Sequence, residues 1–379
     1  MKVSARGRID PFIVMEVMKA ANERQNAGGD VIHMEVGQPS TPAPRPVLEA
    51  ARRALGNDRL GYTDALGIPP LREAIARHYR DYYGIAVAPE RIVVTTGSSG
   101  AFLLAFLAAF DVGDRVATAE PAYPAYRNIL TALGIEMVPV PARADVDFRL
   151  RPEMLADIGR VDGILVATPA NPTGTMLDRD GLLGLVALSA ERQVRLIVDE
   201  IYHGITYGGR AETVLALTDE ALVINSFSKY FSMTGWRLGW MVVLPDLMRS
   251  VECLAQNLFI SPPSISQWAA VAAFDSYEEA DANVARYAEN RAILLGELPN
   301  AGFDRFAPTD GAFYLYADVS RLTNDATDFC RRMLHETGIA ATPGIDFDRP
   351  EGHHFVRFSF AGSTAEMREA VRRLKGWRK

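Results

Sequence analysis

Short apolar runs that end in polar residues recur along the first two thirds of the chain. They include Ile92–Val94, Gly163–Val166, Leu196–Val198 and Ala221–Ile224. Continuous apolar runs of this length are typical of strands that are buried on both faces of a parallel sheet. Helical stretches such as Ala101–Phe110 separate them, so strand and helix alternate from about residue 70 to about residue 245. The pattern predicts an α/β fold in which helices cover both faces of a mainly parallel sheet.

The pattern changes in the last third of the chain. Glu278–Gly296 is a long polar stretch that predicts a helix leaving the α/β unit. Two strand-like runs follow, Gly311–Tyr316 and His354–Phe360, and both have helical segments beside them. This arrangement predicts a smaller α+β domain after the larger one.

Composition narrows the classes of function. The chain has 379 residues, 48% of them hydrophobic and 23% charged, and a formal net charge of −7. This charge provides no general basic face for nucleic acid or anionic lipid. The longest apolar stretch, Ala101–Phe110, covers about half of a membrane span. We therefore expect small molecules, and neither nucleic acid nor a membrane, as binding partners.

The cysteines and the first residues point to a compartment. Cys253 and Cys330 form no Cys-x-x-Cys motif, so we expect free thiols in a reducing environment and no metal centre. Met1–Arg6 leads into no signal-peptide core. These features predict a cytoplasmic location.

Lys229 is the first candidate for chemistry, because lysine is scarce in this chain. The chain contains five lysines, and Lys229 is the only one between Lys19 and Lys375. It stands shortly after the apolar run Ala221–Ile224, at the end of a predicted buried strand. Arginine is the better residue for ion pairs, whereas lysine has a primary amine that can lose its proton and form a Schiff base. Lys229 is therefore either an ordinary exposed lysine or a nucleophilic amine, and its neighbours decide between the two.

Polar segments follow the other predicted strands as well. Asp199 ends the run Arg195–Val198, Asn171 lies in the segment after Gly163–Val166, and Gly97 opens a glycine- and serine-containing turn after Ile92–Val94. In open α/β sheets, ligand groups gather at the carboxyl ends of the strands. We expect these segments to converge on one crevice.

The motifs occur in an order that resembles a known family. Asp199-Glu200-Ile201-Tyr202, Ser226-Phe227-Ser228-Lys229 and Gly235-Trp236-Arg237 follow one another as they do in fold-type I pyridoxal-phosphate enzymes, specifically class I/II aminotransferases of the aspartate aminotransferase superfamily. The resemblance runs from about Gly37 to Arg357. It implies transfer of an amino group from an L-amino acid to a 2-oxo acid, with pyridoxal 5'-phosphate as the cofactor.

The resemblance also implies a domain organisation. A large cofactor-binding domain with a seven-stranded sheet is expected over residues 46–285. A smaller, discontinuous α+β domain is expected from both termini, over residues 1–45 and 286–379. Family members of this kind place two active sites across a two-fold interface, so a homodimer with shared active sites is expected.

Pyridoxal phosphate needs an amine for its aldehyde and partners for its ring. By resemblance, Lys229 forms the Schiff base and moves the proton at Cα, and Asp199 pairs with the pyridine nitrogen. Asn171 and Tyr202 match the pair that hydrogen-bonds the phenolic oxygen, and Tyr123 matches the aromatic that stacks on the ring. The Asn171–Pro172 bond is expected to be cis. From the residues alone, Asp199 is also consistent with a helix N-cap and Tyr123 with simple packing.

A strand-to-helix turn such as the one at Gly97 favours a phosphate, because its backbone N–H groups and helix dipole point at the ligand. A plain serine N-cap would have the same sequence. By resemblance, the cofactor's phosphate is bound by Gly97, Ser98, Ser99, Ser226, Arg237 and, from the neighbouring subunit, Tyr62.

The substrate's α-carboxylate has its own expected partners. Arg357 matches the arginine that binds this group with both nitrogens of its fork, while Gly37 and Asn171 complete the substrate site by resemblance. Arg357 alternates with apolar neighbours, so the solvent side of an edge strand is the alternative for it.

Two positions depart from the pattern of family members that take acidic substrates. The segment Gln256–Pro263 lacks the expected arginine, and Ser99 stands where some members have a lysine. A neutral or aromatic amino donor is therefore expected, provided that no other arginine, such as Arg8, enters the site.

Two other functions share most of these residues. A β-lyase or related eliminating enzyme would use the same Lys229, Asp199 and Arg357. A non-catalytic aminotransferase-like domain of a transcription regulator would need an attached DNA-binding domain, and the residues ahead of Gly37 are few and not basic enough to supply one.

Overall fold

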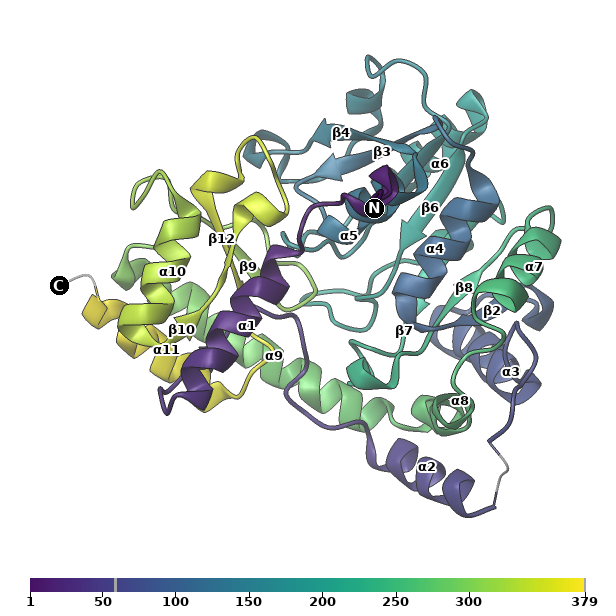
Figure 1. Ribbon diagram of the computed structural model, residues 1–379, viewed down its shortest axis with the longest axis horizontal. Helices are drawn as coiled ribbons and strands as arrows, with labels where there is room; N and C mark the ends of the chain where they lie inside the picture. Colours follow the sequence, from purple (N-terminus) through teal and green to yellow (C-terminus); the bar gives the residue numbers. More distant parts are fainter. Residues whose placement is uncertain (58–59, 378–379) are drawn as a thin grey trace.

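A seven-stranded sheet forms the centre of the larger part of the protein (Figure 1). The computed structural model describes residues 1–57 and 60–377. The strands of this sheet, in spatial order, are β2 (Ile92–Thr95), β8 (Gly239–Val242), β7 (Ala221–Ser226), β6 (Arg195–Asp199), β5 (Gly163–Ala167), β3 (Arg115–Glu120) and β4 (Glu136–Pro141). Only β8 runs antiparallel to its neighbours; the other pairs are parallel. The predicted mainly parallel sheet is confirmed.

Helices bury both faces of this sheet, and the strands supply apolar side chains to each layer. In β6, Leu196 and Val198 pack into one core cluster while Ile197 packs into the other, as the two-residue period of a strand requires. The helices of the first layer are α3 (Pro69–His78), α6 (Arg179–Arg192) and α8 (Ser264–Ala270). Those of the second layer are α4 (Gly97–Ala109), α5 (Pro124–Leu133) and α7 (Met248–Leu258).

The smaller part combines both ends of the chain, at the left of Figure 1. An antiparallel sheet has the order β11-β12-β9, and β1 pairs in parallel with β10. Its elements are α1 (Ile13–Asn26), β1 (Ile32–His33), β9 (Tyr314–Asp318), α10 (Ala326–Thr337), β10 (Ile339–Ala340), β11 (Thr342–Pro343), β12 (Phe355–Ser359) and α11 (Thr364–Trp377). The N-terminal segment therefore folds onto the C-terminal third.

Two further helices complete the fold. α9 (Tyr277–Glu297) is the predicted long polar helix, and it runs from the larger part into the smaller one (Figure 1). α2 (Arg45–Asn57) packs against α8. The expected boundary between residues 285 and 286 falls inside the continuous helix α9, so the division into two domains stays a proposal. Within residues 1–57 and 60–377, no helix is long and apolar enough to cross a membrane.

The end of α10 holds the N-terminal segment in place. Gly338 caps this helix in the left-handed region, with φ of 72°, and its carbonyl accepts a 2.8 Å hydrogen bond from the N–H of Ile32 in β1. A Cβ at Gly338 would overlap the carbonyl oxygen of Asp30. Glycine is therefore needed here both for its backbone conformation and for its lack of a side chain.

We predict that Gly338→Ala lowers the thermal midpoint of unfolding more than Gly84→Ala does. Gly84 has a φ of 74° at the end of another helical turn, but nothing lies within 4 Å of a Cβ placed there. Both variants carry the left-handed strain of about 1–2 kcal/mol, and only Gly338→Ala adds an overlap with Asp30. Equal shifts in differential scanning calorimetry would show that the overlap relaxes without cost.

Candidate active site

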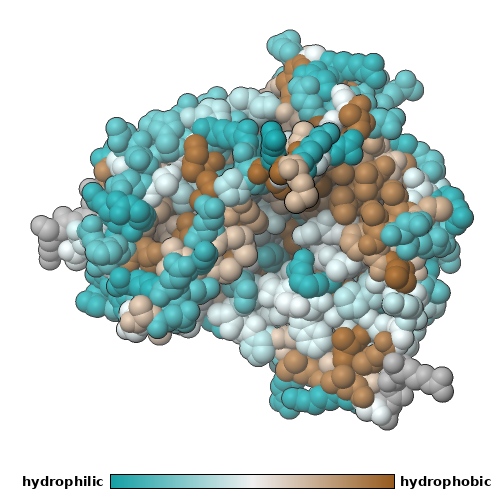
Figure 2. Space-filling model, viewed as in Figure 1, coloured by the Kyte–Doolittle hydropathy of each residue, from teal (hydrophilic) through white to brown (hydrophobic). Residues whose placement is uncertain are grey.

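A cavity of about 440 Å³ opens at the carboxyl ends of the central strands, between the larger and smaller parts. Figure 2 shows this region as a hollow in the middle of the face, with hydrophobic side chains along part of its rim. The cavity brings together ten of the residues indicated by the sequence: Gly37, Ser98, Ser99, Tyr123, Asn171, Asp199, Tyr202, Lys229, Arg237 and Arg357. Gly97, Ser226 and Tyr62 are not among its lining residues.

Lys229 lies in the turn after β7, whose six residues are all buried. Its Nζ donates a 2.6 Å hydrogen bond to the carbonyl oxygen of Gly37. Burial, together with the positive charges of Arg357 and Arg237, lowers the pKa of this amine to about 8, although the negative charge of Asp199 opposes the shift. A much larger fraction of the amine is therefore unprotonated near neutral pH than in an exposed lysine, as a nucleophile requires.

Asp199 ends β6, the strand beside β7, and is 3% exposed. One carboxylate oxygen accepts a 3.0 Å bond from the N–H of Ile201, and the other accepts a short bond from the hydroxyl of Tyr126. Burial raises the pKa of Asp199 to about 6, although these two bonds and the charge of Lys229 oppose the rise. The carboxylate is therefore ionised at neutral pH and fixed in direction.

The sequence did not indicate Tyr126. It lies in the first turn of α5, three residues after Tyr123, which is the N-cap residue of this helix. Their rings meet edge to face, with centroids 5.3 Å apart. This spacing is the signal that could have identified Tyr126 as a second aromatic of the site.

The start of α4 has the features of an anion-binding turn. The helix begins at Gly97 directly after β2, and its N-cap residue Thr96 makes no side-chain capping bond. Gly97 has a φ of 69°, and a Cβ there would lie 2.5 Å from Nη2 of Arg237. The glycine thus leaves room for the guanidinium beside the helix N-terminus, where Ser98 and Ser99 line the cavity. Free N–H groups, hydroxyls and a permanent positive charge together suit a phosphate.

The hydroxyl of Ser226 is hydrogen-bonded within the chain. Its oxygen lies 3.0 Å from the carbonyl oxygen of Leu238 and 2.8 Å from the hydroxyl of Ser228. Ser228, two residues later, is among the residues that line the cavity. The expected contact of Ser226 with the cofactor's phosphate stays a prediction.

Tyr62 lies outside the cavity of its own chain. Its side chain is 83% exposed, the largest exposure among the aromatic residues described. The expected contact with a neighbouring subunit is neither supported nor contradicted by one chain, and it stays a prediction.

Arg357 lies in β12 and is buried, with 3% exposure. One terminal nitrogen donates to the side-chain oxygen of Asn171 at 2.9 Å, and the other donates to the carbonyl of Glu35. Its guanidinium also stacks over the rings of Tyr314 and Phe347, at 4.4 and 4.6 Å from their centroids. The fork is therefore held rigidly at the cavity wall, whereas the solvent side of an edge strand would leave it free. The Asn171–Pro172 peptide is cis.

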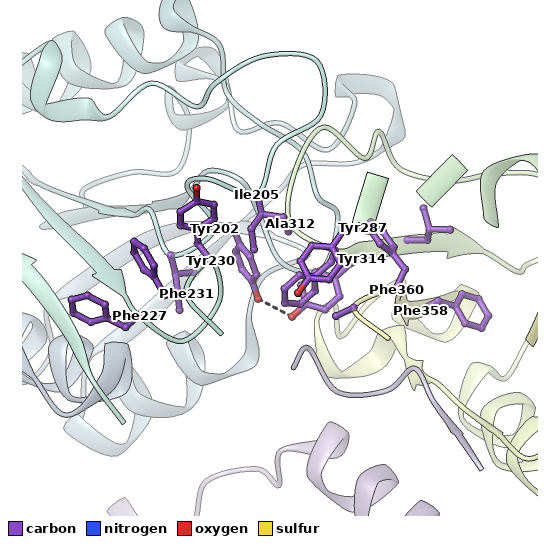
Figure 3. Close-up of a cluster of buried hydrophobic side chains, with 14 of the residues drawn as sticks. Tyr202, Ile205, Phe227, Tyr230, Phe231, Tyr287, Ala312, Tyr314, Phe358 and Phe360 are labelled. Atoms are coloured by element: carbon purple, nitrogen blue, oxygen red, sulfur yellow. Dashed lines mark hydrogen bonds between the residues drawn. The ribbon is translucent and has the colours of Figure 1, made fainter. Parts of the chain in front are cut away.

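Tyr202 and Tyr314 connect the two parts of the fold at the cavity. Tyr202 follows β6, Tyr314 begins β9, and their hydroxyl oxygens are 2.7 Å apart (Figure 3). A Cβ at residue 37 would overlap the hydroxyl of Tyr314, which explains why Gly37 is a glycine. The sequence did not indicate Tyr314, because its neighbours in β9 read as ordinary core residues.

Helix α1 supplies an apolar wall. Phe12, Val14, Met15 and Met18 line the cavity, and the ring of Phe12 meets that of Tyr123 edge to face at 5.7 Å. The carboxylate of Asp346 accepts the backbone N–H groups of Ile13 and Val14 and so anchors the first turn of this helix.

Charge in the cavity is limited. Among the lining residues in the described part of the chain, Lys229, Arg237 and Arg357 are the cations and Asp199 is the anion. Within residues 1–57 and 60–377, no group of histidine, cysteine and acidic side chains could hold a metal ion.

Comparisons with known proteins agree with this geometry. Residues 29–374 match the family described as aminotransferase class I and II. The chain is 52% identical to the valine–pyruvate aminotransferase of Mycobacterium tuberculosis over 99% of this chain and 98% of that protein. A crystal structure of an aminotransferase from the same organism has a TM-score of 0.98 at 51% identity, covering 100% of this chain and 99% of that one. Aspartate aminotransferase from Thermus thermophilus, solved with maleate, has a TM-score of 0.93 at 31% identity, covering 99% of both chains.

Class I/II family members use pyridoxal phosphate, and the relatives named above are aminotransferases. The match covers most of the chain, the fold agrees over its whole length, and the cavity lies where the motifs predicted it. The protein is therefore an aminotransferase and belongs to the class I and II aminotransferase family, of fold type I.

Proposed function

We propose that the protein transfers the amino group of a neutral L-amino acid to a 2-oxo acid, with pyridoxal 5'-phosphate bound covalently through Lys229. The observation that carries this proposal is the buried amine of Lys229, which shares one cavity with the carboxylate of Asp199 and with the anion site at α4. The name of the 52% identical relative supports a valine-like donor and a pyruvate-like acceptor. The composition and the free cysteines support a cytoplasmic reaction.

The residues of the cavity fit this cofactor. Gly97 leaves space for Arg237 at the start of α4, which suits a phosphate. Asp199, ionised and oriented by Tyr126, suits a protonated ring nitrogen. Pyridoxal phosphate, when bound, supplies an aldehyde and an electron-withdrawing ring that together make the bonds at a substrate's Cα easier to break.

The proposed binding set keeps the expected residues and adds Ser228, which lines the cavity and whose hydroxyl lies 2.8 Å from that of Ser226. The proposed cofactor-binding residues are Gly97, Ser98, Ser99, Tyr123, Asn171, Asp199, Tyr202, Ser226, Ser228, Lys229 and Arg237, with Tyr62 from the neighbouring subunit.

The chain's own groups would divide the work at the substrate. Arg357 would bind the α-carboxylate through its fixed fork, with Asn171 and Gly37 beside it. Lys229, with its lowered pKa, would accept and return the proton at Cα. Helix α1 would cover the substrate's side chain and exclude water.

The wall of α1 supports an apolar donor. Phe12, Val14, Met15 and Met18 would contact the substrate's side chain, and all are uncharged. Each lining cation in the described part of the chain already has a proposed partner, so an acidic side chain would have no counter-ion from these residues. An unpaired carboxylate in a buried site is costly. No observation favours an eliminating reaction or a non-catalytic role over amino transfer.

The proposed smallest active form is a homodimer. Tyr62 is exposed in one chain, together with Ile260, whose side chain is 51% exposed. Their loops are joined by a 3.3 Å bond from the N–H of Thr63 to the hydroxyl of Ser261. A contact between Tyr62 and the phosphate of the cofactor bound by the neighbouring subunit would explain why this tyrosine is exposed in a single chain.

We predict that Lys229→Ala abolishes multiple-turnover amino transfer. After incubation with pyridoxal phosphate and reduction with borohydride, peptide mass spectrometry should find the cofactor on Lys229 of the wild type and on no residue of the variant. Lys375→Ala is the matched control, because this lysine pairs with Glu297 on the surface and should leave labelling intact. Labelling of another lysine in the wild type would refute the assignment.

We predict that valine is preferred over aspartate as the donor by about 100-fold or more in kcat/KM, because the carboxylate of aspartate would be buried without a partner. A panel of amino acids with pyruvate as acceptor measures this directly. Ser99→Lys should narrow the difference by supplying a cation, whereas Ser99→Met, of similar length and uncharged, should not. Comparable kcat/KM values for the two donors in the wild type would contradict the neutral-donor proposal.

We predict that a Tyr62→Ala variant and a Lys229→Ala variant complement each other after subunit exchange. The heterodimer would have one site with both substitutions and one with neither, so activity at limiting pyridoxal phosphate should exceed the sum of the parents. Differential affinity tags would verify the exchange. If exchange is complete and activity does not rise, Tyr62 does not serve the partner's site.

A further inference from the structure

Tyr314 has no role in the proposed function, yet it stands at the centre of the site. It is 1% exposed, begins β9 and lines the cavity. Its hydroxyl meets that of Tyr202 at 2.7 Å (Figure 3). The pair joins a residue after the large sheet to a residue of the small sheet.

The ring of Tyr314 is fixed by its neighbours. The guanidinium of Arg357 stacks over it at 4.4 Å from its centroid. On the other side, its hydroxyl fills the space that a side chain at Gly37 would need. The carbonyl of Gly37 in turn accepts the bond from Nζ of Lys229. Tyr314 therefore touches the groups proposed to bind the substrate and holds its hydroxyl at one point.

The direction of the protons in the tyrosine pair follows from counting donors. A phenol has a single proton to donate. If Tyr202 donates its proton to the phenolic oxygen of the cofactor, its own oxygen can only accept from Tyr314. For the hydroxyl of Tyr314, Tyr202 is the one hydrogen-bond partner within residues 1–57 and 60–377.

We propose that Tyr314 is a positioning residue: its hydroxyl donates to Tyr202 and so keeps the proton of Tyr202 directed at the cofactor's phenolic oxygen. This inference rests on the proposed function. Donors in a chain strengthen one another, so Tyr202 becomes a better donor when Tyr314 donates to it. A better donor stabilises the anionic form of the phenolic oxygen and lowers the pKa of the covalent link between Lys229 and the cofactor.

The other titratable groups around the covalent link between Lys229 and the cofactor are the same in every variant of the test. The charged side chains that face it are Lys229 itself, Asp199, Arg237 and Arg357, and the remaining phenols are Tyr123 and Tyr126. A variant that changes only the hydroxyl of Tyr314 leaves all of them in place. A shift in the titration then reports the tyrosine pair.

The test is a spectrophotometric pH titration of the cofactor-loaded protein, comparing Tyr314→Phe with Tyr316→Phe. Tyr316 lies on the same strand, is fully buried, does not line the cavity, and has a hydroxyl without a hydrogen-bond partner in the described part of the chain. We expect Tyr314→Phe to raise the titration midpoint by roughly a few tenths of a pH unit, because a neighbouring donor strengthens a hydrogen bond by about 10–30%. Tyr316→Phe should titrate like the wild type. Equal midpoints in all three proteins would overturn the proposal.

A double variant tests whether Tyr314 acts through Tyr202. In a Tyr202→Phe background, Tyr314→Phe should shift the titration midpoint no further, because the hydroxyl of Tyr202 through which Tyr314 acts is already absent. Additive shifts would show that Tyr314 acts independently of Tyr202 and would overturn the inference.

The borohydride labelling of Lys229 distinguishes a failure of the proposed function from a failure of the role proposed for Tyr314. Absent labelling refutes the proposed function itself, whereas intact labelling with an unchanged Tyr314→Phe titration refutes only the role of Tyr314.

Discussion

The structure depends on one requirement, the burial of a primary amine among opposing charges at the end of a sheet. Lys229 is removed from water by the strands and turns around it, and the nearby Arg357 and Arg237 further disfavour its protonated form. Asp199, on the adjacent strand, is the one anion among the lining residues described and partly offsets these positive charges. Two neighbouring parallel strands end at the same edge of a sheet, and this brings a lysine after one strand close to an aspartate at the end of the other. The mainly parallel sheet is therefore part of the chemistry as well as the scaffold.

The smaller part of the fold completes the site from the other side. β12 brings in Arg357, β9 brings in Tyr314, and α1 adds apolar side chains from the N-terminus. The pairing of β1 with β10 joins the two ends of the chain. A substrate that contacts α1 and Arg357 of the smaller part, and Lys229 of the larger part, would connect the two parts of the protein. This arrangement suits an enzyme that must enclose its substrate and then release it.

Substrate specificity in this site would come from the small number of cations in the cavity as well as from its apolar wall. The cations that line it are few, and the proposed cofactor and the α-carboxylate would use all of them. Phenylalanine, valine and methionine side chains at the start of α1 form an apolar part of the remaining wall. Methionine adapts to irregular shapes, so such a wall can accept several apolar side chains. The relatives of this chain include a valine–pyruvate aminotransferase and an aspartate aminotransferase, so proteins of this family share a fold while their names indicate different substrates.

The sequence by itself determined the larger sheet, the long connecting helix and the main candidates of the site. Buried strands that end in Asp199 and shortly before Lys229 are visible as local patterns, because burial of both sheet faces leaves a continuous apolar run. The tertiary structure alone decided that Ser228 lines the cavity, that Tyr126 orients Asp199, and that Tyr314 meets Tyr202. Beyond the end of a strand, the two-residue period no longer gives the direction of a side chain. Contacts with residues far along the chain determine it instead, and a single sequence does not display them.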